Sequence, residues 1–175
     1  MIGYELILKD KENINIDNPN VIKIGGKPTY VPSEESDGYF LMEIYNIDII
    51  GGREDILCWQ IYQDTEFGGE PEVIEITKGA KLYDDNENIV KLRRWITEYD
   101  VTYIEKNWPD EVEGFYDDDI SQIKGNPGEE ITEWCDEVGA EYLGVIYEMF
   151  CPYGDFSFGS MWMVIGMVDG TLVVE

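Results

Sequence analysis

Hydrophobic and polar positions along this chain fall into short runs that are rich in β-branched and aromatic residues. Runs of this kind, bounded by Gly, Pro, Asn and Asp, are typical of β-strands. A hairpin is indicated where the run MVIGMV meets TLVVE, because the dipeptide between them, Asp169-Gly170, favours a two-residue turn. The pattern predicts strands over residues 4–9, 39–45, 56–62, 72–76, 101–105, 141–149 and 160–168.

Two segments have helical spacing instead. In 88–97, Ile89, Leu92 and Ile96 repeat at the interval of an α-helix. In 128–138, a preceding proline and a group of acidic residues favour a helix start, and Gly139 supplies a stop. Many strands and few helices, without regular β-α alternation, predict an α+β fold of mainly antiparallel sheets with two or three short helices.

One pattern occurs twice and predicts two similar halves. Each copy has a Gly-x-Pro turn, an acidic stretch, an aromatic-aliphatic strand and then a strand that carries tryptophan. The matching positions are Pro28 and Pro127, Tyr45 and Tyr147, and Trp59 and Trp162. We therefore expect one compact domain, residues 1–175, built from candidate repeat halves 1–97 and 98–175. Chance similarity between short strands is the alternative explanation.

Charge changes this picture more than any other property. The chain has 175 residues, with 38 Asp and Glu against 12 Lys and Arg, a formal net charge of −26. Residues 98–175 hold 19 of the acids and only two of the bases. Strong acidity would suggest disorder in a chain poor in apolar residues. Here 43% of residues are hydrophobic, including 12 Tyr, 6 Phe and 5 Trp, so we expect a folded protein.

Composition also excludes several function classes. Histidine is absent, which excludes Ser-His-Asp and Cys-His catalysis and His-ligated metals within this chain. The negative charge argues against direct binding to nucleic acid and to anionic membrane surfaces. No catalytic residues, metal site or cofactor are predicted, and the acidic run from Asp84 lacks the Gly and Glu that a calcium-binding EF-hand loop needs.

The cysteines and the first residues bear on the compartment. Cys58, Cys135 and Cys151 are odd in number, lack the spacing of a metal site, and are predicted to be small buried thiols. The sequence MIGYELILKDKENINID does not have the pattern of a signal peptide. We therefore expect a cytoplasmic protein.

One acidic cluster is the predicted partner-binding site. It interleaves six carboxylates with two aromatic side chains, which suits a basic partner: the carboxylates attract cationic groups, and the aromatics supply the buried anchors. A solvated loop is the alternative interpretation. The site residues are Asp110, Glu111, Glu113, Phe115, Tyr116, Asp117, Asp118 and Asp119.

The chain also resembles a known family. The strings IGGKPTYVP, FLMEIYNID and ILCWQIYQD, in this order, are similar to motifs of the YwqG-type family of uncharacterised bacterial proteins. Towards the C-terminus, YLGVIYEM and GDFSFGSMWMVIG resemble the family's second strand motif and its WGDxG-like segment. The sequence departs from the family at Glu43, where the family usually has Gln. It also lacks the Pro-rich stretch that the family has between the strands that correspond to FLMEIYNID and ILCWQIYQD. The resemblance implies a duplicated α+β fold, no established activity, and members of an accessory or immunity type.

These observations favour a non-enzymatic acidic protein that neutralises a basic protein partner. The partner would be a nuclease toxin or a nucleic-acid-binding defence protein, because such proteins are cationic in order to grip phosphates. The protein would then be an immunity or antitoxin-type inhibitor, or a phage anti-defence DNA mimic. Two alternatives are a carboxylate-based or metal-assisted hydrolase and an acidic structural or housekeeping module.

Overall fold

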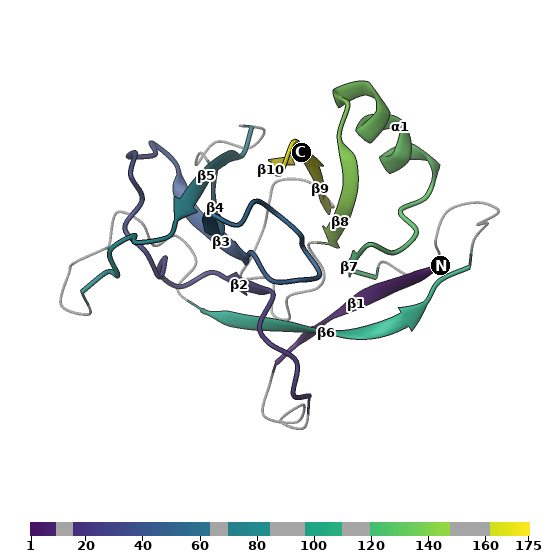
Figure 1. The fold of residues 1–175 in the computed structure, drawn as a ribbon, viewed down its shortest axis with the longest axis horizontal. Helices are drawn as coiled ribbons and strands as arrows, with labels where there is room; N and C mark the ends of the chain where they lie inside the picture. Colours follow the sequence, from purple (N-terminus) through teal and green to yellow (C-terminus); the bar gives the residue numbers. More distant parts are fainter. Residues whose placement is uncertain (10–15, 64–69, 85–96, 110–119, 148–161) are drawn as a thin grey trace.

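The computed structural model describes residues 1–9, 16–63, 70–84, 97–109, 120–147 and 162–175. Within these ranges the chain forms ten strands and one helix (Figure 1). Their bounds are β1 Ile2–Leu8, β2 Ile22–Ile24, β3 Tyr39–Tyr45, β4 Ile56–Gln63, β5 Glu72–Thr77, β6 Tyr99–Asn107, β7 Gln122–Ile123, α1 Glu129–Val138, β8 Glu141–Tyr147, β9 Trp162–Val168 and β10 Thr171–Val174.

The predicted α+β class is wrong. Strands hold 49% and helix 8% of the described residues, and the strands form one antiparallel sheet that curls into a nearly closed barrel (Figure 1). Of the two predicted helices, 128–138 is present as α1, and 88–97 lies outside the described residues except for Thr97. The class prediction failed because a sheet that curls on itself buries its inner face without a layer of helices.

The structure confirms where most of the strands lie. The predicted hairpin is also present: Val168 pairs with Thr171, and the turn residues Asp169 and Gly170 both have positive φ, 51° and 77°. Positive φ at both central positions is the geometry that favours Asp-Gly in a two-residue hairpin. The predictions omitted β2 and β7, which are too short for an alternating pattern to appear in the sequence.

The strand order along the sheet is β10-β9-β8-β7-β1-β6-β2-β3-β4-β5. The order is symmetric between the two halves. If β1 is exchanged with β6, β2 with β7 and so on up to β5 with β10, the result is the same order read from the other edge of the sheet. The first strand of each half therefore pairs with strands of the other half: β1 lies between β6 and β7, and β6 lies between β1 and β2. At the centre of this pattern Ile7 of β1 faces Thr102 of β6.

Hydrogen bonds and register shifts in the strand ladders also match between the two halves. The hydrogen bond from Gly25 N to Leu41 O and that from Lys124 N to Leu143 O are both 2.8 Å long. Irregular register follows in each half, in the β3–β4 ladder and in the β8–β9 ladder. A two-unit duplication would produce this arrangement; the duplication itself, and the halves 1–97 and 98–175, stay a prediction.

The tryptophans that the sequence spacing aligned do not occupy equivalent positions in the ladders. Trp59 pairs with Ile44, whereas the partner of Ile146 is Met163. Trp162 is one residue earlier and packs on the opposite face of the sheet, beside α1.

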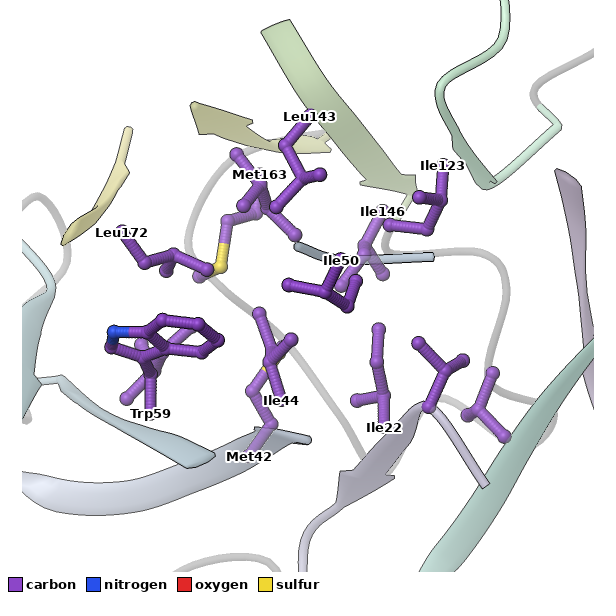
Figure 2. Close-up of a cluster of buried hydrophobic side chains, with 14 of the residues drawn as sticks. Ile22, Met42, Ile44, Ile50, Trp59, Ile123, Leu143, Ile146, Met163 and Leu172 are labelled. Atoms are coloured by element: carbon purple, nitrogen blue, oxygen red, sulfur yellow. The ribbon is translucent and has the colours of Figure 1, made fainter. Parts of the chain in front are cut away.

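The main core lies inside the curled sheet and takes side chains from both halves. Figure 2 shows Ile22, Met42, Ile44 and Trp59 pointing towards Leu143, Ile146, Met163 and Leu172 across the interior. Trp59, Ile22, Ile44 and Met42 are fully buried. Because the core needs residues from both halves, neither half encloses a complete core by itself.

Candidate functional site

The predicted partner-binding residues, Asp110, Glu111, Glu113, Phe115, Tyr116, Asp117, Asp118 and Asp119, all lie outside the described residues. The residues before and after them are described. The preceding strand, β6, and the following strand, β7, pair with β1 on its two sides. The Met1 ammonium donates to Trp108 O (3.1 Å), and Trp108 N donates to Met1 O (2.8 Å). The described strands before and after the predicted site are therefore both hydrogen-bonded to the N-terminal strand β1.

Helix α1 displays a second group of carboxylates that the sequence did not single out as a site. Ile131 and Cys135, one turn apart, pack against Val145 and Val164 on the outer face of the sheet. With 3.6 residues per turn, the five acids of the helix fall on the side opposite these two residues. These acids, all exposed, are Glu129, Glu130, Glu133, Asp136 and Glu137.

Asn126 connects this helix to Pro109, the last described residue before the predicted site. Its Nδ2 donates to Pro109 O (3.0 Å), immediately before Asp110, and its Oδ1 accepts from Gly128 N (3.3 Å), which caps α1. The first turn of α1 is thus fixed to the residue that precedes the acidic segment. The available sequence signal was the apolar pair Ile131 and Cys135 at i, i+4 among acids, which the helix prediction did not use.

A buried polar cluster lies on the outer face of the first half. The Glu43 carboxylate, fully buried, accepts from Thr29 N (2.6 Å) and Gln60 Nε2 (2.9 Å) through Oε1. Its Oε2 accepts from Thr29 Oγ1 (2.7 Å) and lies 3.2 Å from Lys23 Nζ. Lys23 Nζ also donates to Lys27 O (2.6 Å) and to Thr29 Oγ1 (2.8 Å).

This cluster satisfies the backbone that crosses the sheet after Pro28. One side of that segment bonds to backbone through the bridge of Tyr30 with Leu82, where Val31 N donates to Lys81 O (2.8 Å) and Thr29 O accepts from Tyr83 N (3.1 Å). Its remaining groups need partners from side chains: Thr29 N uses Glu43, and Tyr30 O accepts from Gln60 Nε2 (2.8 Å). In the second half α1 crosses the sheet at the corresponding place. A helix satisfies its own backbone, so the sheet beneath it presents Val145 and Val164.

The buried cluster is structural rather than chemically reactive. Burial raises the pKa of the Cys58 thiol and of the Tyr45 hydroxyl, and the negative charge of Glu43 raises both further. Both groups therefore stay protonated at neutral pH, and Cys58 does not have the thiolate of a nucleophile. Cys58 and Cys135 are buried free thiols, as predicted, and Cys151 lies outside the described residues.

The geometry and hydropathy of the described residues bear on two other classes of function. No group of three or more Asp, Glu, Cys or His side chains in the described ranges is arranged to hold a metal ion. Among the same residues, no helix has the length and apolar character needed to cross a membrane.

Comparisons with family models, curated proteins and solved structures found no match to this chain. The resemblance to the YwqG-type family therefore stays a prediction, carried by the sequence motifs alone.

Proposed function

We propose that the protein is a non-enzymatic acidic binding protein that neutralises a basic protein partner. It would act as an immunity or antitoxin-type inhibitor, or as a phage anti-defence DNA mimic, and the partner would be a nuclease toxin or a nucleic-acid-binding defence protein. The observation that carries the proposal is the row of five exposed carboxylates on α1, on a helix whose last turn has no basic side chain.

Two physical arguments support this proposal. Like charges one turn apart destabilise a helix, so a fully acidic face costs stability that the fold does not need. The same face raises the rate at which a cationic protein is captured, because long-range attraction steers the encounter. The buried Glu43, in contrast, is used entirely within the fold.

The proposed contact surface combines the acidic face of α1 with residues 110–119, with Phe115 and Tyr116 as anchors. The Asn126 hydrogen bonds to Pro109 and Gly128 support this combination, because they connect the start of α1 to Pro109, the residue before Asp110 in the chain. The proposed compartment is the cytoplasm, since buried free thiols such as Cys58 and Cys135 are typical of a reducing environment.

The test begins with affinity capture from the native host and continues with the purified complex. We expect the affinity to fall steeply between about 0.05 and 0.5 M NaCl, because salt screens attraction between exposed charges. Changing Glu130, Glu133 and Glu137 to Gln is expected to slow association about tenfold. Changing Asp117, Asp118 and Asp119 to Asn should have a similar effect.

The matched control removes three exposed charges elsewhere, by Glu34→Gln, Glu35→Gln and Asp37→Asn. This variant should change the association rate by less than about twofold. Equal losses in the control and the α1 variant, or an affinity that does not depend on salt, would reject the proposed surface.

A further inference from the structure

The curled sheet has one seam. Its edge strands, β5 and β10, contact each other, whereas backbone hydrogen bonds join each of the other neighbouring strands. Within the described residues no ladder pairs β5 with β10. The two edges therefore meet through side chains.

Arg53, in the loop between β3 and β4, connects the two edges. Its Nη2 donates to Glu75 Oε2 (2.8 Å) on β5, and its Nη1 donates to Thr171 Oγ1 (3.0 Å) at the start of β10. Its Nε donates to Asp55 Oδ1 (3.2 Å) in the same loop. The Arg53 chain also packs on Gly170, where an added Cβ would lie 2.6 Å from Arg53 Cγ.

Core residues lie directly beneath this connection. Gly52 packs against the Trp59 indole, since an added Cβ would clash with its Cη2 atom. Trp59 and Leu172 are close to each other in the interior (Figure 2). The loop that carries Arg53 thus covers the place where the two halves meet in the core.

We propose that the seam between β5 and β10 is the line along which the barrel opens, and that Arg53 is its latch. Backbone ladders hold every other pair of neighbouring strands, and local opening follows the regions with the fewest such bonds. The latch is partly exposed, with 41% of the Arg53 side chain accessible, so salt screens its ion pairs. Opening would expose the backbone edges of β5 and β10 and respond to ionic strength. This inference does not depend on the proposed function.

The test is amide hydrogen exchange on the full-length protein at neutral pH, comparing Arg53→Gln with the unchanged chain. Exchange in β5 and β10 is expected to accelerate about three- to tenfold, while β3 and β8 keep their rates. The matched control is Lys106→Gln, which breaks the Lys106–Glu5 ion pair (2.9 Å) of similar exposure on β6. That control should leave exchange in β5 and β10 unchanged.

Two further variants distinguish a link between β5 and β10 from an ordinary surface ion pair. Thr171→Val removes the bond to β10 alone and should accelerate exchange at both edges about twofold. Asp55→Asn removes the Arg53 partner that lies in the same loop, and it should leave the exchange rates of β5 and β10 unchanged. Uniform acceleration over all strands, unchanged rates at β5 and β10 in Arg53→Gln, or equal effects of Thr171→Val and Asp55→Asn would overturn the latch.

Discussion

Glu43 and Val145 show that the polarity of a buried side chain in the sheet depends on the backbone that lies over it. The two residues correspond in the strand pattern, since Lys23 pairs with Glu43 as Gln122 pairs with Val145. An extended segment lies over Glu43 and needs a polar partner, whereas a helix lies over Val145 and needs an apolar one. Burying a carboxylate is tolerated here because each oxygen is hydrogen-bonded and a cation lies alongside.

We predict that Glu43→Gln destabilises the protein by about 3–5 kcal/mol, because it leaves the buried Lys23 ammonium without its counter-charge. Urea unfolding would measure the change. Glu105→Gln, the same substitution at an exposed position, is the control and should change stability by less than about 0.5 kcal/mol. Adding Lys23→Met to Glu43→Gln should recover part of the loss. A loss below about 1 kcal/mol for Glu43→Gln would contradict the structural role given to this carboxylate.

At the scale of elements, the first turn and the C-terminal cap of α1 stabilise the helix, whereas the charges in its last turn destabilise it. Gly139 ends it in the left-handed conformation (φ 68°), with Ala140 N donating to Cys135 O (2.8 Å). Glu129 and Glu130 in the first turn complement the positive end of the helix dipole. Asp136 and Glu137 lie near the negative end, where a carboxylate is unfavourable.

This asymmetry gives a prediction with a matched pair of variants. Glu137→Lys and Glu130→Lys change the net charge equally, but only Glu137→Lys improves the interaction with the helix dipole. We expect Glu137→Lys to be the more stable protein by about 1 kcal/mol at low salt. Thermal unfolding would show the difference, and it should shrink at about 0.5 M NaCl. Equal stability of the two variants at low salt would contradict the argument.

At the scale of the whole molecule, net charge opposes compactness. With 38 acids against 12 bases, the folded chain repels itself, and the exposed ion pairs of Arg53 and Lys106 each offset little of this repulsion. Without histidine, no imidazole titration changes this balance near neutral pH.

We therefore predict that monovalent salt stabilises the protein. Between about 0.02 and 0.5 M NaCl the free energy of unfolding should rise by about 1 kcal/mol, or roughly 2–4 °C in Tm. Potassium and tetramethylammonium chloride should act like sodium chloride, since the effect is screening rather than binding of one cation. A Tm that falls with salt would show that attractive pairs outweigh the repulsion.

The sequence by itself determined most of the local structure. Runs rich in β-branched and aromatic residues placed most of the strands, Asp169-Gly170 placed the hairpin, and the acidic run with Gly139 placed α1, because each of these depends on neighbours in the chain. It also indicated an acidic surface with partner-binding potential at 110–119, which stays a prediction. The sequence could not show that the start of α1 is bonded to Pro109, because that depends on the Asn126 contact between residues far from each other in the chain.

Only the tertiary structure decided the fold class, the strand order and the roles of Glu43 and Arg53. The two-residue β7 and the three-residue β2 are too short for a periodic signal, yet they link each half to the other. Arg53 and Thr171 lie 118 residues apart, so no local pattern could pair them. A carboxylate in the middle of a strand indicates an exposed edge unless its partners are known. Closure of a sheet is set by long-range register, and the free energy of that register comes from contacts that exist only after the chain has folded.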